Sequence, residues 1–154
     1  MGLIMFYQLS HSSTAQTARA LLEKSRVAGW QVMVRGTDQP ALEALDQALW
    51  HGPTDSFLPH GLDTQPHPNL QSILLGSGAA PQEYEALMLI DGAAFSTSEV
   101  ERMKRVMILF DGQNEAILNQ ARMQWKEVAT LGQEAQFWSE ASGSWALQQS
   151  RPAD

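Results

Sequence analysis

Hydrophobic residues along this chain fall into two kinds of pattern that alternate with one another. Short apolar runs, typical of strands buried on both faces, cover residues 3–7, 31–35, 86–90 and 106–110. Longer segments place apolar residues three or four positions apart, as in helices with one buried face, over about 14–29, 38–50 and 114–131. The alternation predicts strands and helices that follow each other along the chain.

The pattern is weaker in a few parts of the chain. Residues 51–82 hold five prolines and predict a loop-rich span with one short strand at 72–75. A short helix is predicted over about 98–104, between two of the apolar runs. Near the end, residues 137–147 predict a last strand or a hairpin that turns at Ser142-Gly143, and residues 150–154 predict a frayed tail.

This order of elements predicts the fold class α/β, in the form of a three-layer α/β/α sandwich with a mostly parallel, mixed central sheet. Right-handed crossovers between parallel strands would place helices on both faces of the sheet. We expect a single domain over residues 1–149, because no linker, tandem repeat or low-complexity tract interrupts the pattern.

Composition narrows the classes of function. The 154 residues include no cysteine, which excludes disulfides, thiolate nucleophiles and cysteine-bound zinc. Seventeen acidic residues against ten basic ones give a net charge of −7, so we expect nucleic acid to be met only indirectly, through a partner. We also expect a cytoplasmic protein that contacts no membrane, because the sequence has neither a long apolar run nor a secretory signal.

Two Asp-Gly pairs, Asp91-Gly92 and Asp111-Gly112, follow neighbouring apolar runs. Ligands of open α/β sheets bind at the carboxyl ends of the strands, so one hypothesis is a nucleotide- or metal-binding enzyme that uses both aspartates. The other interpretation is that each pair forms a turn, which we favour because no phosphate-binding glycine motif occurs. The four histidines lack the spacing of a compact zinc pair, and no serine-nucleophile motif is present. We therefore expect no catalytic residue, cofactor or metal.

The predicted helix over 114–131 carries a further candidate site. Its apolar stripe includes Trp125, and Arg122 and Lys126 lie one turn apart on the neighbouring edge. The two cations form either a solvated face or an anion-accepting rim beside an aromatic pocket, suited to a peptide with acidic residues and a terminal carboxylate. A second basic cluster, which is either a solvated turn or an accessory patch for an acidic partner, is made of Arg102, Lys104 and Arg105.

Four segments of the chain share their residues and spacing with a known family. They are Phe6-Tyr7, Leu45-Asp46-x-Ala48-Leu49-Trp50, Ser56-Phe57-x-Pro59-His60 and Ala121-Arg122-x-x-Trp125-Lys126. Together they resemble the chi subunit of bacterial DNA polymerase III, and the two central segments are the most specific. The resemblance implies an α/β sandwich that serves as a non-catalytic accessory subunit of the clamp-loader assembly.

The resemblance also implies partners and the residues that bind them. Members of the family bind the acidic, Pro-Phe-ended C-terminal tail of single-stranded-DNA-binding protein and, in some bacteria, the psi subunit. Carried over to this sequence, Arg122 would contact the terminal carboxylate, with Trp125 and Lys126 beside it. Phe57 would line the apolar pocket, and Leu118 stands where a further basic residue is expected. A pure scaffold that binds only another loader subunit is the remaining alternative.

Overall fold

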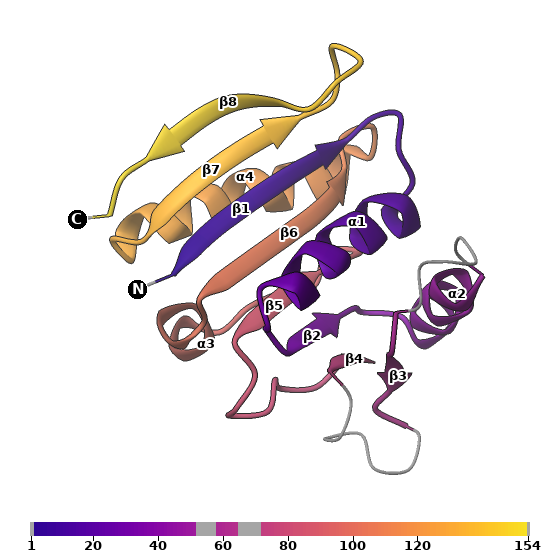
Figure 1. The fold of residues 1–154 in the computed structure, drawn as a ribbon. Helices are drawn as coiled ribbons and strands as arrows, with labels where there is room; N and C mark the ends of the chain where they lie inside the picture. The colour runs from indigo at the N-terminus through magenta and orange to yellow at the C-terminus, as the bar shows by residue number, and fades with distance from the viewer. Residues whose placement is uncertain (1, 52–57, 65–71, 154) are drawn as a thin grey trace.

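The computed structural model describes residues 2–51, 58–64 and 72–153 (Figure 1). In this part of the chain one sheet is formed by β1 (Leu3–Leu9), β2 (Val32–Arg35), β3 (Gly61–Leu62), β4 (Ile73–Gly76), β5 (Ala86–Leu89), β6 (Arg105–Asp111), β7 (Glu134–Ser139) and β8 (Ala146–Arg151). The helices are α1 (Thr14–Val27), α2 (Gln39–Trp50), α3 (Thr97–Arg102) and α4 (Glu115–Thr130). None of the helices described is long and apolar enough to span a bilayer.

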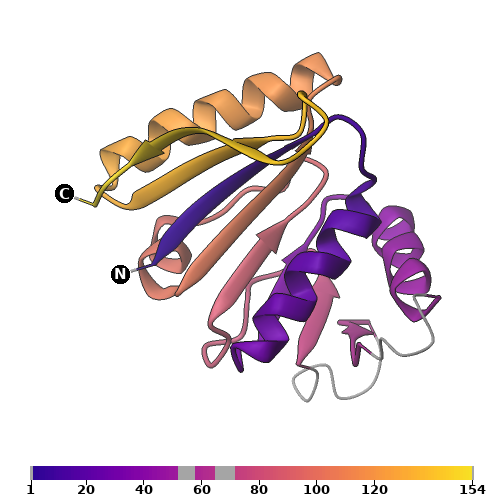
Figure 2. The same ribbon diagram turned by 45° about the horizontal axis from the view of Figure 1, so that its top comes forward.

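The sheet has the strand order β3-β4-β2-β5-β6-β1-β7-β8. Every neighbouring pair is parallel except β7 and β8, which are antiparallel. Helices α1 and α2 pack on one face of the sheet and α3 and α4 on the other, which gives three layers (Figure 2). The predicted fold class, a three-layer α/β/α sandwich with a mostly parallel, mixed sheet, is confirmed.

Side chains of the central strands alternate between two apolar cores. In β1, Ile4 and Phe6 belong to the core under α3 and α4, whereas Tyr7 and Leu9 belong to the core under α1 and α2. This alternation follows from the period of two in a strand. Because helices cover both faces, most of these side chains are shielded from water, and the central strands are therefore mostly apolar.

The last strand extends farther than the sequence predicted. β8 continues to Arg151, so the expectation of a frayed tail over 150–154 is wrong for its first two residues. Ser150 and Arg151 pair with Gln136 and Ala135 of β7. The sequence of β8 does not predict a strand, because most of its residues are exposed and polar and apolar residues do not alternate with polar ones.

Two smaller differences concern the middle of the chain. Helix α3 ends at Arg102, two residues before the predicted end, because Met103 is extended with φ −75° and ψ 144°. The short strand β3 lies within the span that was predicted to be loop-rich. The predicted strand at 72–75 is β4, shifted by one residue.

The two central segments of the family resemblance meet around a buried histidine. His60 is 3% exposed, and its ring nitrogens lie 2.6 Å from the Leu58 carbonyl oxygen and 3.0 Å from the Asp46 carbonyl oxygen. The Trp50 ring lies over His60, with 4.2 Å between the ring centroids. These contacts fix the end of α2 against the chain that enters β3, so His60 has a structural role here.

Candidate partner-binding groove

Helix α4 carries three of the predicted site residues along one edge. It buries Ala121 and Val128 against the sheet, since these positions lie two turns apart on one helix face. Arg122, Trp125 and Lys126 lie on the adjoining edge, where the helix passes beside β7 and β8. The local sequence alone therefore places the two cations next to the aromatic ring.

A groove of about 530 Å³ separates this edge of α4 from the sheet. We call it the α4 groove. Its lining residues come from β1, α4, β7 and β8 and are Gln8, Leu118, Arg122, Trp125, Lys126, Phe137, Ser139, Gln148 and Gln149. The structure thus brings Arg122, Trp125 and Lys126 together in one concave surface with residues of two strands that follow the helix.

Aromatic contacts hold the apolar floor of the α4 groove. Trp125 meets Phe137 edge to face, with 5.7 Å between centroids and 87° between ring planes. Below them, the fully buried Phe6 contacts both rings at 5.3 and 5.9 Å. Such interlocked rings keep their orientation, so the groove offers a rigid apolar surface before any ligand arrives.

Arg151, at the end of β8, supports Trp125 from behind. Its guanidinium carbon lies 4.1 Å from the centroid of the Trp125 ring, and the same group donates a hydrogen bond to the Trp125 carbonyl oxygen. Burial lowers the pKa of Arg151, but an arginine remains charged near neutral pH. This contact was not predicted from the sequence, because the last strand or hairpin was predicted to end near residue 147, before Arg151.

The two cations at the rim of the α4 groove have almost no partners among the residues that the structure describes. Arg122 donates a long hydrogen bond of 3.5 Å to Asn119 Oδ1. Among the described residues, no carboxylate forms an ion pair with Arg122 or Lys126. Both side chains are exposed, and none of the lining residues is acidic. The groove is therefore locally positive on a protein whose net charge is −7.

The remaining predicted residues of this site have different outcomes. Phe57 lies outside the residues that the structure describes, so its place in the pocket stays a prediction. Leu118 lines the α4 groove one turn before Arg122. The position where the family resemblance predicted a basic side chain therefore contributes an apolar wall.

The second basic cluster is engaged in contacts within the chain. Arg102 donates to backbone carbonyl oxygens of the loop before β5, among them those of Gln82 at 2.9 Å and Tyr84 at 3.0 Å. Lys104 forms an ion pair with Glu85 at 2.8 Å. The third member, Arg105, lies over the Trp30 ring at 5.2 Å. None of the three lines the α4 groove, and an accessory role for Arg102, Lys104 and Arg105 stays a prediction.

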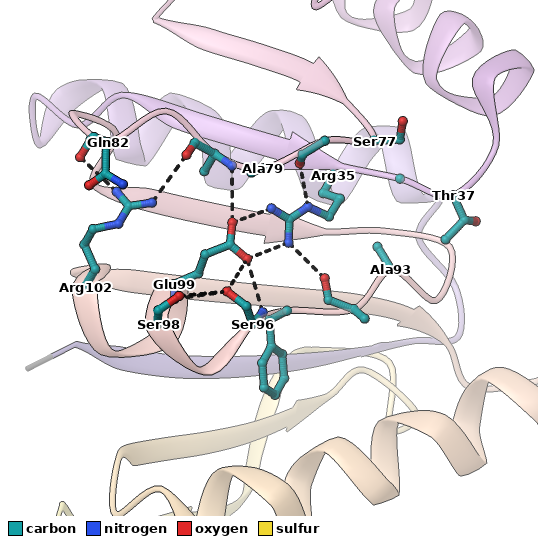
Figure 3. Close-up of a pocket in the computed structure, with 15 residues that line it drawn as sticks. Arg35, Thr37, Ser77, Ala79, Gln82, Ala93, Ser96, Ser98, Glu99 and Arg102 are labelled. Atoms are coloured by element: carbon teal, nitrogen blue, oxygen red, sulfur yellow. Dashed lines mark hydrogen bonds and ion pairs between the residues drawn. The ribbon is translucent and has the colours of Figure 1, made fainter.

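A larger pocket of about 860 Å³ lies at the carboxyl ends of β2, β4 and β5. We call it the switch pocket, because the chain leaves β2 and β5 toward opposite sides of the sheet there, the position where open α/β sheets bind ligands. Figure 3 shows its arginines turned toward protein groups. Arg35 forms a two-pronged ion pair with Glu99 and also donates to Gly78 and Ala94 carbonyl oxygens at 2.9 and 3.0 Å.

The two aspartates that the enzyme hypothesis invokes do not line the switch pocket. The Asp111 carboxylate accepts the Gln113 N–H at 2.9 Å, which is the turn role that we favoured. Asp91 adopts a positive φ of 53°, and burial together with Asp38 raises the pKa of its carboxyl group. Within the described part of the chain, no group of three or more histidines and acidic residues is arranged to hold a metal ion.

The loop between β1 and α1 presents three consecutive backbone N–H groups, of Ser10, His11 and Ser12. In nucleotide-binding α/β proteins the corresponding turn holds a phosphate. Here the carboxylate of Glu140 accepts all three N–H groups, at 2.8 to 3.0 Å, and the Ser12 hydroxyl as well. Although burial alone would raise it, these hydrogen bonds hold the pKa of Glu140 down at about 2.

A comparison with protein families matches residues 1–136 to the model described as DNA polymerase III chi subunit, HolC. The chain belongs to this family. Members of this family are accessory subunits of DNA polymerase III that serve DNA replication, as the resemblance predicted. No curated protein matches the chain in sequence.

The family match and the α4 groove overlap only in part. The match includes the wall formed by α4, with Arg122, Trp125 and Lys126. It ends one residue before Phe137, so the opposite wall, with Gln148 and Gln149 of β8, lies beyond it. This second wall was not predicted from the sequence, because its residues reach the groove only through the pairing of β7 with β1 and β8.

Proposed function

We propose that this protein is a non-catalytic accessory subunit of the clamp-loader assembly that binds the acidic C-terminal tail of single-stranded-DNA-binding protein. The observation that carries the proposal is the α4 groove, in which Arg122 and Lys126, both without an acidic partner among the described residues, flank the ring of Trp125. Membership of the chi family supports the same proposal, since it places the chain in DNA replication.

The groove suits the three chemical features of such a tail. The terminal phenylalanine ring would lie on the apolar floor formed by Trp125, Phe137 and Leu118. The terminal carboxylate would meet Arg122, because a guanidinium can hold a carboxylate with two parallel hydrogen bonds. Aspartates farther up the tail would be attracted to Lys126.

A short-tail interface of this kind has modest affinity and weakens with salt. Many tails on one DNA strand coated with single-stranded-DNA-binding protein would offset the modest affinity through avidity. The net charge of −7 fits such a division of labour, since the subunit would then meet DNA through its partner rather than directly. Binding of a psi subunit at another surface is compatible with this proposal, and the work would take place at the cytoplasmic replisome.

The test is fluorescence anisotropy with a labelled peptide that copies the tail, titrated with wild type, Arg122→Ala and Arg26→Ala. Arg26 is an exposed arginine of α1 that does not line the α4 groove, so it matches the charge change at a distant place. We expect Arg122→Ala to weaken binding at least tenfold, which is about 1.4 kcal/mol, and Arg26→Ala to change it less than twofold.

Other outcomes of this titration would contradict the proposal in distinct ways. Equal weakening by both variants would mean that only the overall charge matters. Binding that survives Arg122→Ala would remove the tail from the α4 groove and direct attention to Arg102, Lys104 and Arg105. No binding of the tail by wild type would leave the pure scaffold, which binds only another loader subunit, as the better account.

A further inference from the structure

The end of the sheet is covered on one face only. Figure 1 shows α4 behind β7 and β1, while the described residues place no helix in front of β7 and β8. On this open face Leu147, 47% exposed, pairs with Trp138, and directly paired residues of antiparallel strands point to the same side. The exposed leucine therefore lies on the open face, beside Trp138.

A hollow of about 340 Å³ lies where this open face meets α1. We call it the tryptophan pocket. Its lining residues are Met5, Tyr7, Ser12, Gln16, Thr17, Ala20, Leu21, Lys24, Trp138 and Trp145. It is separate from the α4 groove, because adjacent residues of β7 point to opposite faces: Phe137 lines the groove and Trp138 lines the tryptophan pocket.

The walls of the tryptophan pocket are held in place by contacts within the chain. Trp145 meets Tyr7 edge to face, with 5.6 Å between centroids, and Trp138 Nε1 donates to Gln136 Oε1 at 3.0 Å. Glu140 ties the turn between β7 and β8 to the loop before α1. A site that is ordered beforehand loses less entropy when it binds a ligand.

The charges around the tryptophan pocket are positive. Lys24 lines it, is exposed and forms no ion pair among the described residues. The Arg105 guanidinium donates to the sulfur of Met5 at 3.3 Å and lies close enough to Tyr7 to act on its pKa, although burial dominates and raises that pKa to about 12. None of the lining residues is acidic, and the nearby Glu140 carboxylate is taken up by backbone N–H groups.

We propose that the tryptophan pocket is a second partner-binding site, which takes an internal segment of a partner protein with one aromatic side chain between acidic residues. The aromatic ring would insert between Trp138 and Trp145, and an acidic neighbour would pair with Lys24. The site needs no chain end, because the described residues that line it include no arginine to hold a terminal carboxylate. It therefore differs in ligand from the α4 groove and does not depend on tail binding.

The test uses a short peptide, acetylated and amidated, with a single phenylalanine between aspartates. It is titrated into ¹⁵N-labelled protein, and the indole N–H resonances of the five tryptophans are followed by NMR. Lys24→Glu and Arg26→Glu serve as matched variants, since both reverse one positive charge in the last turn of α1 and only Lys24 lines the pocket. A second peptide carries alanine in place of phenylalanine.

We expect the Trp138 and Trp145 resonances to move and that of Trp125 to stay. Lys24→Glu should weaken binding about tenfold, Arg26→Glu less than twofold, and the alanine peptide should cause no comparable shift. Static Trp138 and Trp145 resonances up to about 1 mM peptide, equal effects of the two variants, or equal shifts with the alanine peptide would each overturn the proposal. A shift of Trp125 alone would do so too, by placing the peptide in the α4 groove.

Discussion

The α4 groove and the switch pocket each have two cationic side chains beside open space, but those cations contact different things. In the switch pocket, Arg35 and Arg102 donate to Glu99 and to backbone carbonyl oxygens (Figure 3). In the α4 groove, Arg122 has one long contact with a neutral side chain, and Lys126 has no charged partner within the described residues.

Pocket size and the availability of the cations favour different pockets as the place where an anion would bind. The switch pocket is the larger, about 860 Å³ against about 530 Å³, and it lies where α/β sheets often bind ligands. Its two arginines already bind Glu99 or backbone carbonyl oxygens, so an incoming anion would have to break existing hydrogen bonds. In the α4 groove, by contrast, a carboxylate would find cations exposed to water and ready to bind.

The largest difference between the two pockets should be in stability, and Glu99→Ala should reveal it. Removal of this carboxylate leaves Arg35 buried without its counterion, which should lower the free energy of unfolding by about 3–5 kcal/mol. Arg122→Ala should change it by less than about 0.5 kcal/mol, because Arg122 is exposed. Urea unfolding of the two variants measures both values, and similar losses would mean that Arg122 is as structural as Glu99.

Acid pH should lower the free energy of unfolding through two carboxylates that are bound within the chain, Glu99 of the switch pocket and Glu140. The pKa of Glu99 is held at about 2, first by the hydrogen bond with Arg35 and then by backbone N–H groups. Backbone N–H groups likewise hold the pKa of Glu140 at about 2. Both values lie below the usual 4.5, so the stabilisation is complete above pH 4.5 and is lost as the pH falls toward 2. Each group should contribute about 2–3 kcal/mol.

Unfolding free energies between pH 6 and pH 2 test this expectation, with Glu140→Gln as the comparison. The amide stays neutral throughout, so this variant should be less stable at pH 6 and should lose less stability on acidification than wild type. Parallel pH curves for the two proteins would show that Glu140 is not held by the N–H groups of Ser10, His11 and Ser12.

Arg122→Lys should have a smaller effect, and on binding alone. A lysine keeps the charge but cannot hold a carboxylate with two parallel hydrogen bonds, so the affinity for the tail peptide should fall about threefold to tenfold. Anisotropy at two salt concentrations separates the contributions, since both proteins should keep a similar salt dependence. Full affinity in the lysine variant would show that Arg122 acts only as a point charge.

The smallest effect should come from Arg151→Ala, which removes a support rather than a contact with the ligand. Loss of the cation–π contact with Trp125 should weaken tail binding about twofold to fivefold, corresponding to about 0.5–1 kcal/mol. The Trp125 indole resonance in the free protein should shift as well. An unchanged resonance together with unchanged affinity would show that Trp125 keeps its place without Arg151.

Most of the fold was predictable because the signals are local. The apolar runs predicted the buried strands. The residues that α1 and α2 bury, such as Leu22 and Leu49, are spaced three or four positions from other buried residues of the same helix, and this spacing predicted the helices. The strand β8 was missed in part because an exposed edge strand is stabilised by pairing with β7 rather than by its own apolar residues.

The candidate site likewise has a part that was predictable from local sequence and a part that was not. Arg122, Trp125 and Lys126 lie on one helix within five residues, so spacing alone placed them together. Phe137 and Arg151 reach Trp125 from two strands, and which of their faces meets α4 depends on strand register. Contacts of that kind are set by the whole sheet and leave no mark in a local pattern.

A double cycle between Arg122 and the end of the tail peptide measures whether Arg122 holds the terminal carboxylate. Wild type and Arg122→Ala are each titrated with the peptide as a free acid and as a C-terminal amide. If Arg122 holds the carboxylate, amidation should weaken binding to wild type about tenfold and binding to Arg122→Ala hardly at all, a coupling of about 1 kcal/mol or more. Equal weakening of both proteins by amidation would contradict the contact and, with it, the account of the α4 groove.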